Sequence, residues 1–480
     1  DFGALFASIR HKGESIGEVI GDAIGAKAKK LFIVFAYLTL ILVVAAFASI
    51  VANTFKATYT ADGLVDLEAS AANASTAIIS IMFILMAIIF GFFVYRRNAP
   101  LGISTIIGVI GIVACMVIGL NWHPIYLSYT VWMIIVGLYI GVASVTPVWI
   151  LLQPRDYLSS FLLYGMMVLA VVGIIGAHPI VDMPAFLGFE DTLKPTGTSL
   201  GYMFPALFVT IACGAVSGFH SLVGSGTTSK QLDQEKDAKP IAYGGMLLEC
   251  VLAIITLCAI AYARETGHVK GATDIFAGGI AAMIGAIPGL ESMENSMYTL
   301  LVLTYSAFCL TSLDTATRLA RFMFQEFWLE PGETPKDIKN GFKKMMVNPY
   351  FATVLTVFLG VMLGMNGFMK IWGLFGAANQ LLAGIGLLAV AAWLGNAGKN
   401  NRMFLFPMSF MMVVTICSLA LIVRNQILII MKGGADWGPY AQAIIGSFLI
   451  VLALELAVEG YRTIFKKKDP DDNGEAPALD

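Results

Sequence analysis

Long apolar runs, separated by short charged or glycine- and proline-containing stretches, follow one another along most of this chain. A helix needs about 20 mainly apolar residues to cross the hydrocarbon core of a bilayer, and about twelve runs are long enough. The expected spans are 31–54, 76–95, 101–120, 129–151, 158–176, 203–222, 241–262, 294–317, 349–365, 371–394, 403–423 and 439–459. The sequence therefore predicts an all-α polytopic membrane protein.

The composition supports this class and excludes others. Hydrophobic residues make up 58% of the chain and charged residues 13%, and the mean hydropathy of +0.79 lies outside the range of soluble globular chains. The formal net charge of -2 and the scattered lysines argue against nucleic acid as a partner, which would need a concentrated basic face. The six cysteines lie in apolar runs without CxxC spacing, so they predict neither a disulfide framework nor a metal site.

The basic residues predict the orientation, because short loops rich in Lys and Arg stay in the cytoplasm. If the loop around Lys29 is inside, alternation places Arg97, Arg155 and Lys236 inside as well. The cluster that includes Lys343 must also be inside, so the doubtful run 272–289 is expected to lie on the outer face without crossing. The same parity puts the C-terminus in the cytoplasm.

The segment "ACGAVSGFHSLVGSGTTSKQL", residues 212–232, interrupts an apolar run with glycines and hydroxyls. Non-helical backbone at membrane depth survives only where protein or a water-filled cavity surrounds it, and secondary transporters place their sites at such broken helices. The alternative is a helix interface in which glycines allow close packing. We expect the stretch from Gly214 to Gly226 to be unwound. The candidate substrate-binding residues are Ser217, Gly218, His220, Ser221, Gly224, Ser225, Thr227 and Thr228.

Together with "HPIVDMPAF" and "DFGALFASIRHKGESIGEVI", this segment closely resembles the carbon starvation protein A family over most of residues 1–425. The resemblance implies a bacterial inner-membrane transporter related to the amino acid-polyamine-organocation superfamily. Members of the family are linked to peptide uptake during starvation and to proton-driven pyruvate uptake.

The resemblance also implies a five-plus-five inverted repeat with extra helices, in which 203–222 opens the second repeat. The family continues upstream of the first residue, so we expect N-terminal helices to be missing, including the partner of 203–222. Residues 1–465 are expected to form one transporter domain, and 466–480 a disordered cytoplasmic tail.

Ionisable residues inside spans are costly and are therefore functional candidates. His220 and Glu249 are candidates for proton coupling or for polar contact with the substrate, since an imidazole titrates in the working pH range; each could instead be a structural buried group. Asp314 could serve transport or form an ion pair with Arg318 one helical turn away.

Two further groups of residues have open alternatives. His178 and Asp182 are expected at the outer mouth, either as a gate or as part of a rigid proline-containing loop. Thr311, Ser312 and Thr315 fall on the helix that helps to hold sodium in this superfamily, and hydroxyl oxygens suit a hard cation. They could equally bond to carbonyls one turn earlier in their own helix.

Three function classes are compatible with a polytopic membrane chain. A secondary transporter fits the broken helix and the dispersed single charges, with a peptide or a small carboxylate as substrate, H⁺ or Na⁺ as a possible coupling ion, and no other cofactor or metal. A channel would show a repeated filter motif, and a membrane-embedded enzyme a compact catalytic set, and neither is found. The sequence does not indicate an oligomeric state.

Overall fold

A computed structural model describes residues 1–465 apart from 98, 181–183, 187, 191–201, 268–270, 331–332, 334–336, 340, 366–367 and 434–435. The regular secondary structure of the described part is helical except for one short hairpin of strands β1 (Thr58–Tyr59) and β2 (Val65–Asp66) and an isolated bridge between Glu190 and Tyr202. The predicted tail at 466–480 and the predicted gate residue Asp182 lie outside the described residues.

The α-helices follow the order of the predicted spans, with short extra helices at the start of the chain. Their bounds are α1 (Phe2–Arg10), α2 (Ile16–Ala23), α3 (Ala26–Phe55), α4 (Leu67–Gly91), α5 (Leu101–Asn121), α6 (Tyr129–Val145), α7 (Leu152–Ala177), α8 (Phe208–Ile211), α9 (Gly218–Gly226), α10 (Ala238–Thr266), α11 (Ala272–Gly285), α12 (Glu294–Phe327), α13 (Gly341–Met346), α14 (Pro349–Gly364), α15 (Phe368–Asn396), α16 (Arg402–Met431) and α17 (Trp437–Phe465). Single π-helical turns lie at Phe92–Arg96 and Met203–Leu207, and 3₁₀ turns at Ala212–Gly214, Thr228–Lys230, Glu235–Asp237 and Glu291–Met293.

Among the residues that the structure describes, ten helical segments are long and apolar enough to cross a membrane, so the chain is a multi-pass membrane protein. The other two predicted spans form shorter helices. The span predicted at 129–151 ends at Val145, because Thr146 precedes Pro147 and takes an extended conformation. The span at 349–365 begins with Pro349 at the first helical turn and has 16 residues, about 24 Å of helix.

The doubtful run 272–289 forms α11, a helix of 14 residues and about 21 Å, which is shorter than the hydrocarbon core. It packs on the N-terminal half of α12, where Met283 and Ile284 share a cluster with Leu301 and Val302. Its placement on the outer face without crossing stays a prediction.

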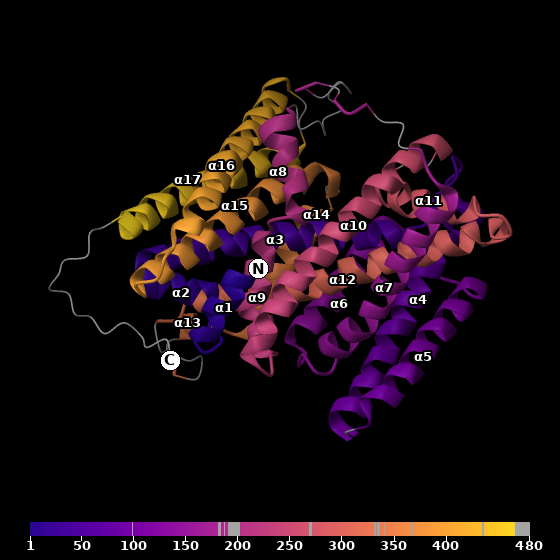
Figure 1. The fold of residues 1–480 in the computed structure, drawn as a ribbon, viewed down its shortest axis with the longest axis horizontal. Helices are drawn as coiled ribbons and strands as arrows, with labels where there is room; N and C mark the ends of the chain where they lie inside the picture. Colours follow the sequence, from indigo (N-terminus) through magenta and orange to yellow (C-terminus); the bar gives the residue numbers. More distant parts are fainter. Residues whose placement is uncertain are drawn as a thin grey trace.

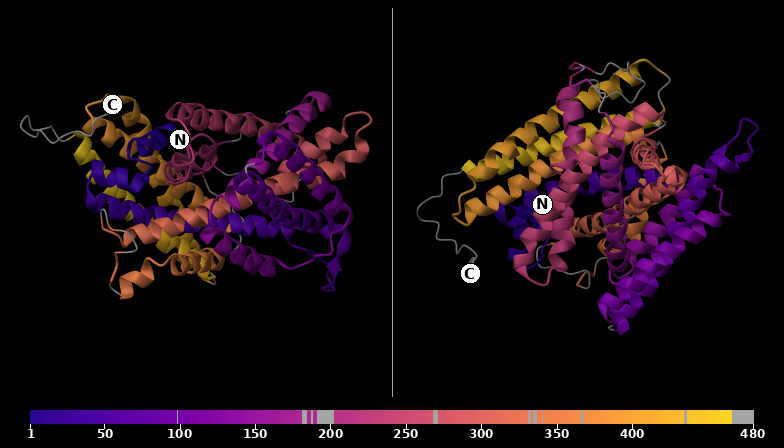
Figure 2. Two further views of the ribbon diagram at one scale, coloured as in Figure 1. Left: turned by 90° about the horizontal axis from the view of Figure 1, so that it is seen from below. Right: turned by 45° about the vertical axis from the view of Figure 1, so that its right-hand side comes forward.

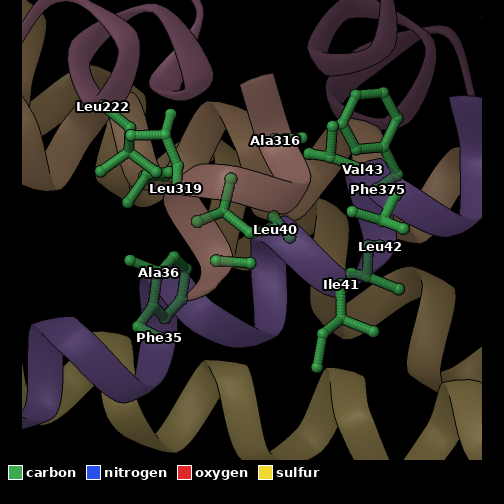
Figure 3. Packing of buried hydrophobic residues seen from close by; sticks show 14 of the residues in the cluster. Phe35, Ala36, Leu40, Ile41, Leu42, Val43, Leu222, Ala316, Leu319 and Phe375 are labelled. Carbon is green, nitrogen blue, oxygen red and sulfur yellow. The ribbon is translucent and has the colours of Figure 1, made fainter. Parts of the chain in front are cut away.

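The long helix α3 lies in the middle of the molecule, and α12, α14, α15 and α17 pack around it. In Figures 1 and 2, α15, α16 and α17 lie on one side of this centre and α4 and α5 on the other. Figure 3 shows the main core, where Phe35 and Leu40 of α3 lie near Leu319 of α12 and Leu222 of α9. Leu222 thus connects the short helix α9 to the main core, and α9 packs mainly on α1 and α15.

Ion pairs bring several basic segments to one end of the molecule. Lys27, at the start of α3, contacts Glu459 near the end of α17 at 3.1 Å. Lys29 lies 3.9 Å from Glu326 at the end of α12 and also pairs with Glu18. The end of α12 that carries Glu326 is opposite to the end that packs on α11.

Candidate functional site

The helical segment from 203 to 230 is broken in the middle, as the glycines and hydroxyls predict. The 3₁₀ turn Ala212–Gly214 is followed by non-helical residues at 215–217, and α9 starts at Gly218. The prediction that Gly214 to Gly226 is unwound was wrong in extent. Residues Gly218–Gly226 form a nine-residue α-helix, because glycine lowers helix stability by only about 1 kcal/mol and tertiary packing offsets that loss.

A buried asparagine of α15 holds the break together. The side chain of Asn379 is fully buried; its Oδ1 accepts a hydrogen bond from the Phe219 backbone N–H at 2.7 Å, and its Nδ2 donates to the Ser217 hydroxyl at 3.0 Å. The first N–H groups of a helix have no partner within the helix. Asn379 supplies one from a different helix.

A cavity of about 500 Å³ opens beside the broken helix. Its walls come from α1, α7, α9, α10 and α12. The residues that line it are Asp1, Leu5, Asp156, Phe219, His220, Val223, Gly224, Thr227, Thr228, Gln231, Ile241, Ala242, Gly245, Met246, Glu249, Thr311, Ser312 and Thr315. The structure therefore brings together candidates that are separated by almost 100 positions in the sequence.

The predicted substrate-binding residues divide between two faces of α9, according to the helical period. His220, Gly224, Thr227 and Thr228 line the cavity. The other four, Ser217, Gly218, Ser221 and Ser225, are buried in packing contacts.

The packed face of α9 uses its small residues for close approach. A Cβ atom at Gly218 would lie 2.2 Å from the backbone oxygen of Asn379. The hydroxyls of Ser221 and Ser225 donate to the carbonyls of Gly218 and Ser221 in their own helix, at 2.7 and 2.8 Å. The close-packing interpretation therefore describes this face, and the substrate-site interpretation of the cavity face stays a prediction.

His220 and Glu249 meet across the cavity. The Nδ1 atom of His220 lies 3.9 Å from the Glu249 carboxylate and 3.3 Å from the carboxylate of Asp1. The side chains of His220 and Glu249 are 36% and 34% exposed, so both are accessible from the cavity. An imidazole and a carboxylate at 3.9 Å can exchange a proton through one bridging water.

The hydroxyls of α12 form the opposite wall. Thr315 is 8% exposed, and the Thr311 oxygen is buried without a hydrogen bond of normal geometry in the described part of the chain. Thr317, on the same helix but outside the cavity lining, donates to the Leu313 carbonyl at 2.8 Å. The alternative that a hydroxyl donates to a carbonyl in the preceding turn of its own helix therefore holds for Thr317 but not for Thr311.

Asp314 lies outside the cavity lining and has a different partner from the predicted one. It forms a fully buried ion pair with Arg155 of α7, and the Tyr139 hydroxyl donates to it at 2.8 Å. Arg318 instead donates to the carbonyls of Ala143, at 2.8 Å, and of Thr146. The hypothesis of an Asp314–Arg318 ion pair was wrong, because α6 and α7 supply the partners of both residues.

His178 lies at the C-terminal end of α7, exposed and outside the residues that line the cavity. It has a positive φ of 48°, and its ring nitrogen Nδ1 lies 3.3 Å from the Gly176 carbonyl. This geometry ends the helix. A gating role for His178 stays a prediction.

Sequence reasoning missed Asn379, Arg155 and Asp156. Asn379 and Gln380 are a polar pair inside the apolar run 371–394, and this was a usable signal, because polar residues within spans usually bond between helices. Arg155 was interpreted as a loop cation, yet it is 1% exposed in the first turn of α7. Among the residues that the structure describes, no three His, Cys, Asp or Glu side chains form a set that could hold a metal ion.

Comparison with known proteins gives one consistent family. The profile described as "Carbon starvation protein CstA" matches residues 1–269 and 262–418. "Peptide transporter CstA" from Bacillus subtilis (strain 168) is 29% identical over 88% of this chain and 74% of its own length. The protein of the same name from Escherichia coli (strain K12) is 31% identical over 87% of this chain and 66% of its own length.

A third relative is named for a different substrate. "Pyruvate/proton symporter BtsT" from Escherichia coli (strain K12) is 35% identical over 54% of this chain and 35% of its own length. All three relatives are named as transporters and none as an enzyme.

Proposed function

The chain belongs to the carbon starvation protein CstA family, and from this premise we propose that it is a secondary active transporter of the bacterial inner membrane. It takes up peptides or small carboxylates by alternating access. The observation that carries the proposal is the cavity beside the break at 215–217, because a membrane helix that opens onto an ionisable cavity is the usual form of a carrier site.

The cavity face of α9 and the hydroxyls of α12 are the two walls between which the substrate binds. His220, Gly224, Thr227 and Thr228 contribute from one side, and Thr311, Ser312 and Thr315 from the other. The packed residues Ser217, Gly218, Ser221 and Ser225 hold α9 in place and position its cavity face.

Coupling to an ion runs through His220 and Glu249, with H⁺ as the first choice and Na⁺ at the α12 hydroxyls as the second. The 3.9 Å distance between these two side chains supports a proton site, as does the similarity to a relative that is named a pyruvate/proton symporter. The buried pair of Asp314 and Arg155 is a structural support of this site and fixes α12 against α7.

The fold and the orientation extend the same proposal. We infer a five-plus-five inverted repeat with extra helices in a domain of residues 1–465, and a cytoplasmic C-terminus. The gathering of Lys27, Lys29 and their acidic partners at one end supports a cytoplasmic face there. A cysteine at Thr273 of α11 should then react only with a probe added outside.

Counterflow tests the proposed function. Purified protein is reconstituted in vesicles loaded with unlabelled solute, and a trace of labelled solute is added outside. A carrier accumulates the label transiently against its gradient, whereas a channel only equilibrates it and an enzyme converts it. Failure of all peptides, amino acids and short carboxylates to show this overshoot would overturn the proposal.

A further inference from the structure

The charged side chains of the cavity are almost all acidic. Among the described residues that line it, the ionisable side chains that can carry charge near neutral pH are Asp1, Asp156, Glu249 and His220, with no Lys or Arg. The carboxylates of Asp156 and Glu249 are 41% and 34% exposed, so a solute in the cavity can reach them. Among these described side chains, only His220 can offset the negative field of the three carboxylates.

Arg155 does not change this balance, although it is the neighbour of Asp156. Its guanidinium is 1% exposed and lies against the fully buried Asp314, so the two charges cancel each other. The Asp156 carboxylate lies 3.3 Å from the other nitrogen of Arg155 and adds a further negative charge on the cavity side. Taken together, these three side chains present one net negative charge to a solute.

The neutral groups on the same wall are hydroxyls that can accept hydrogen bonds. The buried Thr311 hydroxyl interacts with the Asp156 carboxylate, although the two make no hydrogen bond of normal geometry in the described part of the chain. The Thr311 oxygen can still accept a hydrogen bond from a ligand. Thr315, one helical turn further along α12, is 8% exposed and also lines the cavity.

The size of the cavity restricts the solute further. Its volume of about 500 Å³ falls within the range of about 300–1,000 Å³ for pockets that enclose drug-sized ligands. A three-carbon acid would leave most of it filled with water, and its single carboxylate would face three carboxylates with His220 as the one basic side chain of the described lining.

We propose that this cavity selects solutes with a free ammonium group, such as the amino end of a short peptide, and that Asp156 with Thr311 binds that group. An ammonium group has three N–H donors for carboxylate and hydroxyl acceptors, and it neutralises the extra charge of Asp156. The inference rests on the proposed function, since it names the solute class of the same cavity. It separates aminated solutes from acids without an amine.

Competition in the counterflow assay tests the solute class. With labelled alanyl-alanine as the tracer, unlabelled alanyl-alanine should compete, while N-acetyl-alanyl-alanine and pyruvate should need about tenfold or higher concentrations. Alanine in the same series separates a free amino acid from a peptide as the preferred source of the amine. Exchange of pyruvate or of the N-acetylated peptide as strongly as alanyl-alanine would overturn the inference while leaving a transporter. Absence of exchange by every solute would overturn the proposed function and the inference with it.

A charge-matched variant series tests the assigned residue. Asp156→Asn should raise the KM for alanyl-alanine about tenfold to a hundredfold, because a charge-assisted hydrogen bond is lost. Asp156→Glu keeps the charge and should have a KM much closer to that of the wild type. Asp62→Asn, in the exposed β1–β2 loop, should leave the KM unchanged. Thr311→Val, which changes no charge, is the second variant if Asp156→Asn unfolds. An unchanged KM in folded Asp156→Asn, or in folded Thr311→Val where that variant stands in, would refute the assignment.

Discussion

Replacing Gly218 by alanine places a methyl group where the backbone of α15 already lies. An added Cβ atom would be 2.2 Å from the Asn379 backbone oxygen, 2.5 Å from the Leu382 Cβ and 2.6 Å from the Ala383 backbone nitrogen. Two of these neighbours are main-chain atoms of a buried helix, so they cannot move aside as the end of a flexible side chain would. The whole of α9 must shift instead.

The expected cost follows from these contacts. Overpacking of a buried site by one methyl group usually costs about 1–3 kcal/mol, and rigid backbone neighbours favour the upper half of that range. The gain from alanine over glycine in a helix interior is about 1 kcal/mol, and it is smaller at the first helical position, where Gly218 lies. We therefore expect Gly218→Ala to lower the free energy of unfolding by about 2 kcal/mol.

Two alanine variants of the same segment are matched controls. Nothing lies within 4 Å of an added Cβ at Gly214, and the nearest atom at Gly224 is the Leu5 Cβ at an ordinary 3.7 Å. The thermal unfolding midpoint of the protein in detergent should fall for Gly218→Ala and stay close to wild type for the controls. Equal midpoints for Gly218→Ala and Gly214→Ala would refute the packing argument.

Four further single variants and one double variant test the parts around the cavity. The glutamine in His220→Gln and in Glu249→Gln cannot titrate near neutral pH, so at least one of these variants should flatten the pH profile of uptake between about pH 5 and 8. Wild-type pH profiles in both variants would exclude both residues as coupling groups. Arg155→Met leaves the buried Asp314 carboxylate without its cation and should lower the free energy of unfolding by about 3–5 kcal/mol. The double variant with Asp314→Leu should recover much of this loss. A double variant as unstable as Arg155→Met would contradict the ion-pair account. Asn379→Leu removes the hydrogen-bond acceptor of the Phe219 N–H and should lower the free energy of unfolding by about 1–3 kcal/mol, measured by thermal unfolding. An unchanged unfolding midpoint would show that this helix cap adds no stability.

Hydropathy and loop charge predict the spans because both are local properties of the sequence. The ends of α3, α7 and α10 follow the apolar runs, and the glycine-rich segment is broken near Ser217. The segment gave no indication of which face of α9 would pack. Its residues alternate with the helical period between the cavity and α15, and only the tertiary arrangement decides which set is buried.

The ion pairs and the helix cap could not be predicted, because their partners are distant in the sequence. Arg155 and Asp314 are 159 positions apart, and Phe219 and Asn379 are 160 apart. A pair at i, i+4, such as Asp314 and Arg318, is the natural local guess. Because α12 packs against α7, Asp314 has a closer partner in Arg155. Arg318 donates instead to the backbone carbonyls of Ala143 and Thr146 at the C-terminal end of α6.

The rate at which a cysteine in the cavity is chemically modified, with and without solute, tests whether transported solute binds in this cavity. After removal of the native cysteines, one cysteine replaces Ala242 in the cavity lining, and another replaces Leu64, which is 70% exposed between the strands. A saturating concentration of the solute that exchanges in counterflow should slow modification at position 242 and leave position 64 unchanged. Equal modification rates at 242 with and without that solute, in vesicles that still exchange it, would contradict the account.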